Sequence, residues 1–267
     1  LVRDRLRDFD VIYSTAPTDV VEDLICHGLG IVAIDRMVQL SKDSDPKRIS
    51  ELLLNRHERV GQERTFGVRV KRLGKKGEWD SQSYARALGA ALIEKDPSLS
   101  VDLSNPDWWV KIILEPSAVS SIERRIQGPG GLPTGVQGDV LAQLQTKEDA
   151  LSSFLIMRRG SRIIPVMDSK SEFVELLLKW DPFLGVRSRT KDEHGEMFQR
   201  PAWGVVGLTL EQAQPHIQRR EKAIKTTPLS TLEPLCGWTK REKQALWKHL
   251  NDPSRHPAHP DNTSWFE

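Results

Sequence analysis

A short basic stretch holds the side chains whose chemistry is easiest to interpret. Segment 56–76 carries eight Lys or Arg against two acidic residues, Glu58 and Glu63, an excess of six positive charges. Clustered cations attract the phosphate backbone of a nucleic acid. The same charges could instead form a solvated strand edge that resists aggregation. The candidates for phosphate contacts are Arg69, Lys71, Arg72, Lys75 and Lys76.

The pattern around these cations predicts a strand over 65–72. Phe66, Val68 and Val70 alternate with Arg69 and Lys71. Because successive strand residues point to opposite faces, one face should be buried and the other exposed to solvent. The exposed face would present a row of cations, next to a glycine-containing turn that gives the following lysines an adaptable reach.

Tryptophans extend this candidate surface. Trp79, Trp108 and Trp109 could stack on unpaired bases. The last two fall on a second predicted strand within 101–115, where neighbouring side chains point to opposite faces. At most one of that pair is therefore expected to be available for stacking, and the other should belong to the core.

Helices are predicted between and after these strands. Segment 81–94 has a helical pattern, with Ser81 as the expected N-cap. Arg124 and Arg125 are expected near the end of a later helix. There they would either add to the basic surface or complement the helix C-terminus.

Three segments of this region resemble one family. They are 65–72, 101–107 and the connector 128–138, which reads Gly-Pro-Gly-Gly-Leu-Pro-Thr-Gly-Val-Gln-Gly. Together they resemble the THUMP domain, an RNA-binding module of tRNA-modifying enzymes. More narrowly, they resemble the THUMP region of the tRNA 4-thiouridine synthetases, also called tRNA sulfurtransferases. The resemblance runs from about Leu24 to Val166 and continues weakly to about Leu250.

The resemblance implies an α+β region followed by an α/β region. Segment 1–61 is expected to form a ferredoxin-like unit, shortened at its beginning relative to the family. Segment 62–138 should hold the THUMP domain and its connector. Segment 139–267 should form a reduced layer that resembles an adenylation domain of the pyrophosphatase-loop type.

The connector has two interpretations that the sequence leaves open. Glycines permit close backbone approach, and successive amides can form an anion-binding concavity. The same composition suits a hinge between domains. The residues concerned are Gly130, Gly131, Pro133 and Gly135.

The expected catalytic loop is missing. The sulfurtransferases bind ATP phosphates with a Ser-Gly-Gly-x-Asp-Ser loop at a helix N-terminus, where free amides and the helix dipole favour anions. Here segment 143–150 reads Gln-Leu-Gln-Thr-Lys-Glu-Asp-Ala and contains no glycine. Asp149 lies near the position of the family's aspartate, and Glu148 would repel a polyphosphate.

The sulfur chemistry also lacks a part. The family uses a cysteine after a Pro-Leu-x-Gly-x-x-Lys segment, which 234–240 matches here. Cys236 lies inside that segment, and no cysteine follows it. Persulfide transfer needs a reactive thiolate. Lys240 matches the family's lysine, so Lys240 and Asp149 are interpreted as vestiges of a catalytic site.

Composition sets wider limits. Hydrophobic residues make up 38% of the chain and charged residues 28%, as in soluble globular proteins. Two cysteines, Cys26 and Cys236, exclude a disulfide framework and fit a reducing cytoplasm. No apolar run reaches the roughly 18–20 residues that cross a bilayer. Two histidines and an aspartate in 255–261 form only a weak ligand pattern, so no metal is expected.

These observations predict a tRNA-binding THUMP protein without intrinsic adenylation, sulfur transfer or cofactor. Its expected partner is tRNA, and an active tRNA-modifying enzyme or a second copy of the chain are further candidates. The alternative is an active tRNA sulfurtransferase that uses ATP and Mg²⁺ with a partner-supplied or atypical site. A THUMP methyltransferase lacks support, because no glycine-rich cofactor loop follows a strand in the expected place.

Overall fold

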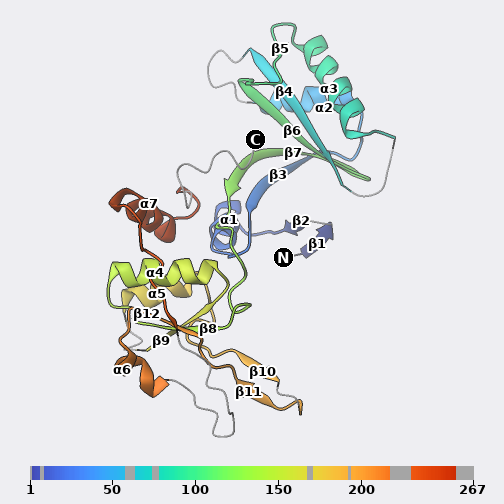
Figure 1. Cartoon of the computed structure of the whole chain (residues 1–267). Coiled ribbons are helices and arrows are strands. Elements are labelled where there is room, and N and C mark those ends of the chain that lie inside the picture. The colour runs from blue at the N-terminus through green and yellow to red at the C-terminus, as the bar shows by residue number, and fades with distance from the viewer. Residues whose placement is uncertain are drawn as a thin grey trace. The chain divides into compact units, whose positions relative to one another are not determined.

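The computed structural model describes residues 2–6, 9–57, 64–73, 78–166, 171–191, 194–216 and 230–256 of a mixed α/β protein (Figure 1). The chain packs into two units. Unit 1 combines Leu1–Thr15 with Asp35–Arg125, and unit 2 combines Ala16–Ile34 with Ile126–Glu267. This division differs from the expected boundaries at 61 and 138, because residues 16–34 pack with the C-terminal segments.

Unit 1 contains a hairpin, a five-stranded sheet and two helices. The hairpin pairs β1 (Val2–Leu6) with β2 (Phe9–Tyr13). The sheet has the order β3-β7-β6-β4-β5. Its strands are β3 (Ala33–Ser41), β4 (Thr65–Arg72), β5 (Ser100–Val101), β6 (Trp108–Glu115) and β7 (Ala118–Gln127). The helices α2 (Pro46–Arg56) and α3 (Ser81–Lys95) pack on one face of this sheet (Figure 1).

The core of unit 1 lies between that sheet face and the two helices. Phe66, Tyr84, Leu88 and Ile112 are at most 1% exposed within it. Helix α3 begins at Ser81, as predicted, but the predicted N-cap Ser81 is wrong. Asp80 is the N-cap, and its carboxylate accepts hydrogen bonds from the amides of Gln82 and Ser83 at 2.9 and 2.8 Å.

The family-like segment 105–107 has a structural role at the start of the parallel pair β4 and β6. Oδ2 of Asp107 accepts hydrogen bonds from the Thr65 hydroxyl, the Thr65 amide and the Arg64 amide, at 2.8, 3.0 and 3.1 Å. The bonds from Thr65, with that from Arg64, hold the pKa of the Asp107 carboxyl below its usual value. This side chain therefore fixes where strand β4 begins.

The segment that carries Arg124 and Arg125 is a strand, and its prediction as a helix is wrong. Residues 118–127 form β7, which pairs antiparallel with β6 from Ile112 opposite Ser121 to Glu115 opposite Ala118. Pairing with a buried neighbouring strand outweighs the local preference of this segment, as is common for strands.

Unit 2 is built on a parallel sheet with the order β13-β12-β8-β9. Its strands are β8 (Asp139–Ala142), β9 (Arg162–Pro165), β12 (Gly204–Val206) and β13 (Ser230–Thr231). The helices α4 (Lys147–Arg158), α5 (Glu172–Leu178) and α7 (Lys240–Asn251) contribute its main core, and β10 (Arg189–Lys191) pairs with β11 (Met197–Gln199) in a hairpin.

Helix α1 (Thr18–Cys26) belongs to unit 2 through the residues that follow it. Leu29 packs against the main core of this unit. The His27 ring meets Trp180 edge-on, with centroids 4.8 Å apart, and Trp180 in turn contacts Phe154. The N-terminal segment 16–34 is thus part of the same core as α4 and α7.

The helical segment that begins at Leu210 is short within the described part of the chain. Helix α6 covers Leu210–Ala213, and a 3₁₀ turn over Gln214–His216 follows it. Pro215 lies in that turn. Proline lacks the amide that an α-helix interior needs, so the α-helix ends before it. Residues 217–225 lie outside the described residues.

A buried ion pair anchors the segment that leads into the β10–β11 hairpin. The Asp139 carboxylate is fully buried and accepts hydrogen bonds from Nε of Arg187 at 3.0 Å and the Ser188 amide at 2.9 Å. The Ser188 hydroxyl donates to the same carboxylate. Nη2 of Arg187 also donates to the Arg200 carbonyl at 2.7 Å. Arg187, held by Asp139, therefore connects the segment before β10 to the segment after β11.

Among the described residues, none of the helices combines the length and the apolar character that a membrane span requires.

Candidate nucleic-acid interface

The sheet of unit 1 has an open face, defined here by Gly67, Arg69 and Lys71 on β4 with Trp109 and Lys111 on β6. The parallel register aligns Gly67 with Trp109 and Arg69 with Lys111, so these side chains share one face. Phe66, Val68 and Val70 point to the opposite face, toward the core. The predicted alternation along 65–72 is therefore confirmed, and the cations lie on the side away from α2 and α3.

Trp109 and Arg69 form a stacked pair on the open face. The Arg69 guanidinium lies 3.8 Å from the centroid of the Trp109 ring. The indole lies directly over Gly67, where a Cβ atom would come within 2.6 Å of Cζ3 of Trp109. Glycine at 67 thus lets the aromatic ring lie flat on the sheet. The Arg69 guanidinium stacks on this ring, and Arg69 is exposed to solvent.

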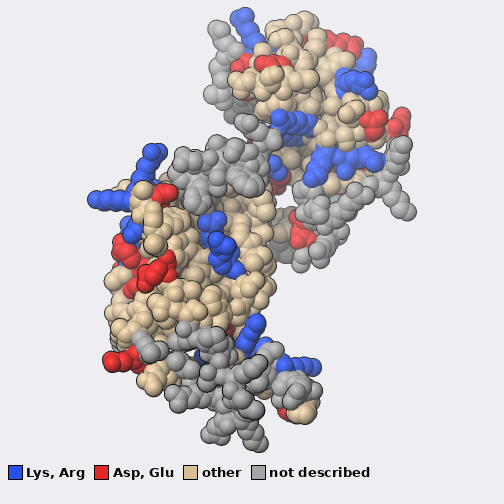
Figure 2. Space-filling view, viewed as in Figure 1, with Lys and Arg blue, Asp and Glu red and all other residues tan. Residues whose placement is uncertain are grey.

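The structure distributes the predicted cations over several environments. Arg69, Lys71 and Arg124 are exposed, and Arg72 is half-buried at the register position of Leu114, on the core side. Lys75 and Lys76 lie outside the described residues. Figure 2 shows that Lys and Arg side chains of unit 1 alternate with acidic ones over the visible surface. The cations that the sheet brings together are those of the open face.

Two predicted residues have structural partners. Arg125 forms two hydrogen bonds with Asp35, from Nε at 2.7 Å and from Nη2 at 2.9 Å, which links β7 to β3. Trp79 is half-buried, packs against the core of unit 1 and meets Tyr84 edge-on at 5.5 Å between centroids. Burial holds the pKa of the Tyr84 hydroxyl well above its usual value.

Lys111 was missed by the sequence reasoning. Only part of the signal was local: Trp109 and Lys111 alternate with the buried Val110 and Ile112, but Ile113 is itself only 5% exposed. That alternation places Lys111 beside Arg69 once β6 is paired in parallel with β4. The parallel pairing is the part that a local pattern does not reveal.

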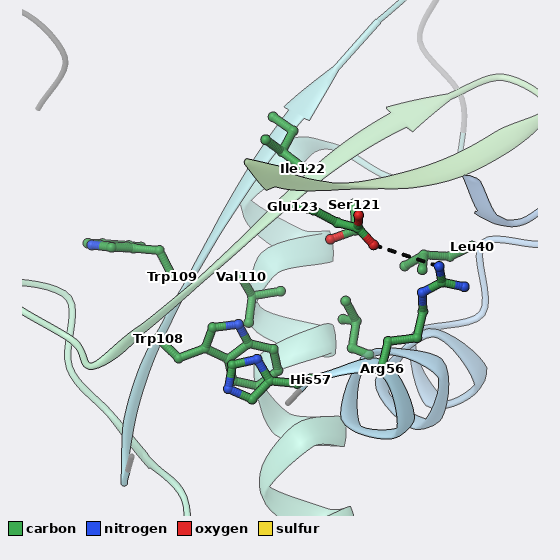
Figure 3. A pocket seen from close by; sticks show the side chains of 10 residues that line it. Leu40, Arg56, His57, Trp108, Trp109, Val110, Ser121, Ile122 and Glu123 are labelled. Carbon is green, nitrogen blue, oxygen red and sulfur yellow. Dashed lines mark ion pairs between the residues drawn. The ribbon is translucent and has the colours of Figure 1, made fainter. Parts of the chain in front are cut away.

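A groove lies between β6, β7 and the end of α2 (Figure 3). It has a volume of about 490 Å³ and is lined by Leu40, Leu53, Arg56, His57, Trp108, Trp109, Val110, Ser121, Ile122 and Glu123. His57 follows the last residue of α2, and its ring stacks on Trp108 with centroids 4.0 Å apart. Trp108 and Trp109 point to opposite sides of β6, as predicted (Figure 3).

The connector glycines are held by backbone contacts within unit 2. The Gly130 amide donates to the Ile31 carbonyl, and the Gly30 amide donates to the Gly130 carbonyl, both at 2.8 Å. Gly130 and Gly131 have φ values of +63° and +78°. A Cβ at Gly131 would come within 2.3 Å of the Arg158 carbonyl oxygen. Gly135 also has a positive φ, and Pro133 lies beside Gly30.

The loop before α4 occupies the place where a phosphate cradle was sought. The N-cap Thr146 and Asp149 form a capping box, in which the Asp149 amide donates to the Thr146 hydroxyl at 3.1 Å. Oδ2 of Asp149 accepts hydrogen bonds from the amides of Gln145 and Thr146, at 3.1 and 2.9 Å. The protein's own carboxylate therefore sits where a free helix N-terminus would hold an anion.

This loop lies at a topological switch point. Strands β9 and β12 flank β8 on opposite sides, and ligands of open parallel sheets bind beyond the carboxyl ends of strands at such a point. The Asp149 carboxylate also packs against Gly207, which follows β12: a Cβ there would come within 3.0 Å of Oδ1. Gln143 lies against the same glycine.

The other candidate catalytic residues are a lysine of α7 and the two cysteines. Lys240 is exposed in the first turn of α7, after the N-cap Thr239. Cys236 is exposed in the turn that precedes this helix, and Cys26 is buried. In the described part of the chain, no group of three or more His, Cys, Asp or Glu could hold a metal ion. His259 and Asp261 of the weak ligand pattern lie outside it.

Comparison with known proteins finds a family match in the middle of the chain. Residues 47–119 match the THUMP domain model. The tRNA sulfurtransferase of Histophilus somni (strain 2336) is 42% identical over 101 residues, and the probable tRNA sulfurtransferase of Staphylococcus epidermidis is 30% identical over 132 residues. These matches cover 38% and 49% of this chain but only 21% and 32% of the relatives.

Solved structures agree with the fold over most of the chain. PH1313 from Pyrococcus horikoshii Ot3 superposes with a TM-score of 0.64 at 21% identity, covering 93% of this chain and 87% of that one. A 4-thiouridine synthetase solved as an RNA complex with bound ATP gives 0.60 at 19% identity, covering 93% and 75%. The recognised resemblance is therefore confirmed: the chain carries a THUMP domain match and is similar to the tRNA sulfurtransferases.

Proposed function

We propose that this protein binds tRNA through the open face of unit 1 and takes part in the tRNA-modification chemistry of its relatives without adenylating tRNA itself. The observation that carries RNA binding is the alignment of Arg69, Lys71 and Lys111 on one sheet face, with Trp109 among them. Cations provide affinity for the phosphates, and an aromatic ring can stack on a base. The THUMP match and the RNA complex of a structural neighbour support the same proposal.

The second half of the proposal concerns unit 2. We interpret unit 2 as a reduced pyrophosphatase-loop-like layer. A polyphosphate at the N-terminus of α4 would have to displace the Asp149 carboxylate from two amides. It would also approach Glu148, which is exposed in the first turn. Both features oppose an anion at that position.

The test of RNA binding is a salt series with a matched pair of double variants. Arg69→Ala with Lys71→Ala removes two cations from the open face. Arg48→Ala with Arg86→Ala removes two exposed cations from α2 and α3 on the opposite side. If each lost phosphate contact lowers the log–log salt slope by roughly 0.7–0.9, the first variant should lower it by about 1.5 and the second by much less.

The outcomes distinguish where RNA binds from whether the protein binds RNA. Equal effects of the two double variants would mean that the open face is not the RNA surface. A wild-type protein that fails to bind tRNA at low salt would sink the proposal as a whole. Binding is measured by filter retention or fluorescence anisotropy with unmodified transcripts.

The absence of adenylation is tested separately. The protein with tRNA, ATP and Mg²⁺ should release no pyrophosphate above a protein-free background, while an active tRNA sulfurtransferase assayed in parallel does. ATP-dependent release would favour the alternative of an active enzyme with an atypical site, for which exposed Lys240 is the first residue to replace.

A further inference from the structure

Helix α7 of unit 2 carries a row of cations on its outer side, here called the basic stripe and defined by Lys240, Arg241, Gln244 and Lys248. Lys240, Gln244 and Lys248 recur every four residues, so they lie along one side of the helix. All four side chains are exposed, while Leu246 on the other side is fully buried. Figure 2 shows Lys and Arg side chains on the part of unit 2 where Figure 1 places α7.

The fold does not use these charges. In the described part of the chain, no ion pair engages Lys240, Arg241 or Lys248. Glu242, the acidic residue of α7, accepts hydrogen bonds from the Thr239 amide and hydroxyl, both at 2.7 Å, and so serves as a cap. Lys240 and Arg241 lie in the first turn, where the helix dipole disfavours cations. The stripe therefore adds nothing to helix stability, which points to a ligand outside the chain.

The aromatic residue of α7 is already engaged within unit 2. Nζ of Lys147 lies 4.7 Å from the centroid of the Trp247 ring, and Phe173 meets that ring edge-on at 6.3 Å between centroids. Trp247 is half-buried and packs against the main core. Proteins that bind single strands rely on exposed aromatic rings for stacking. The basic stripe offers cations and one amide instead.

We propose that the basic stripe of α7 binds the phosphate backbone of a double-helical RNA stem. Base-paired RNA is recognised through its phosphates and 2′-hydroxyls, and Lys, Arg and Gln side chains supply such contacts. Lys240 and Lys248 are separated by about 12 Å along the helix axis, so they can contact different phosphates. Exposed Glu148 and Glu172, in the first turns of α4 and α5, would repel phosphates beside the stripe and confine the RNA to α7.

This inference rests on the proposed RNA binding but concerns a different unit of the chain. The open face of unit 1 combines its cations with Trp109, whereas the basic stripe of unit 2 has no aromatic member. Unit 2 would thereby hold RNA without adenylating it.

The test compares two double variants of unit 2 that each remove one Arg and one Lys. Arg241→Ala with Lys248→Ala changes the stripe. Arg189→Ala with Lys191→Ala removes exposed cations from the β10–β11 hairpin, on another side of unit 2 (Figure 1). The probe is a blunt RNA duplex of about 16 base pairs, which has no unpaired nucleotide. The α7 variant should lower the log–log salt slope of duplex binding by about 1.5, and the hairpin variant should leave it unchanged.

Two further variants separate charge from structure and one surface from the other. Arg241→Lys with Lys248→Arg keeps both charges and should keep duplex binding. Arg69→Ala with Lys71→Ala, combined with the α7 pair in one protein, should lower the slope for tRNA by the sum of the two losses, because distant sites act independently. Thermal unfolding of each variant should match that of the wild type, since the replaced side chains are exposed.

Three results would overturn the inference. An α7 variant with the wild-type salt slope for both duplex and tRNA would remove the stripe from the RNA surface, while RNA binding at unit 1 stands. Polyglutamate that competes as well as the duplex at equal charge concentration would assign the stripe to an acidic protein. A wild-type protein that binds neither duplex nor tRNA would overturn the proposed function, and this inference with it.

Discussion

Asp139→Ala is expected to lower the free energy of unfolding of unit 2 by roughly 3–5 kcal/mol. The carboxylate is fully buried and accepts hydrogen bonds from Arg187 and from two groups of Ser188. Alanine would leave the guanidinium of Arg187, whose side chain is 15% exposed, without its counter-charge. The loss is measured by urea unfolding, with hydrogen exchange of the β8 amides locating it in unit 2.

Removing both partners distinguishes an unpaired charge from a missing contact. Asp139→Ala combined with Arg187→Met should be clearly more stable than Asp139→Ala alone, because no buried cation is left. Arg255→Ala serves as the control at an exposed ion pair with Asp252, and it should change stability little. Equal losses in the single and double variants would show that the charge of Arg187 does not cause the effect.

Gly131→Ala is expected to cost roughly 2–5 kcal/mol, the second large effect. Its φ of +78° strains any side chain, and its Cβ would lie 2.3 Å from the Arg158 carbonyl oxygen, a backbone atom that a rotamer change cannot move. Gly130→Ala is the matched control. It has a similar φ of +63° but meets nothing within 4 Å, so it should cost only about 1–2 kcal/mol.

The comparison of these neighbours isolates the steric contact from the backbone strain. Thermal unfolding of both variants gives the difference directly. Equal losses at the two positions would mean that only the left-handed conformation matters, and that the connector is not packed against α4 as described. A larger loss at Gly131 would assign this part of the connector to close packing.

The sequence predicted those elements whose patterns are local. Residues 65–72 alternate, so the strand and its two faces could be inferred. The opposite directions of Trp108 and Trp109 follow from strand geometry alone. The missing glycines of 143–150 were visible as well, because that absence needs no knowledge of tertiary contacts.

What escaped prediction depends on segments that are distant in sequence. Strand β7 was expected as a helix because its partner β6 determines its conformation. The place of α1 is set by the contact of His27 with Trp180, more than 150 residues away. The capping box at Asp149 and its contact with Gly207 required both the loop conformation and the strand order. The groove required the point at which β6 and β7 separate.

The division of the chain into two units also affects the order in which its segments can fold during synthesis. Residues 35–125 of unit 1 leave the ribosome as one continuous run, so the sheet and its two helices can form early. Residues 16–34 are made before them, yet their partners in unit 2 start only at Ile126. Helix α1, whose last residue Cys26 is fully buried in the folded protein, must therefore wait for the last half of the chain. A fragment that begins at 139 would lack this helix, and a nascent chain stalled before Ile126 would leave it unpacked.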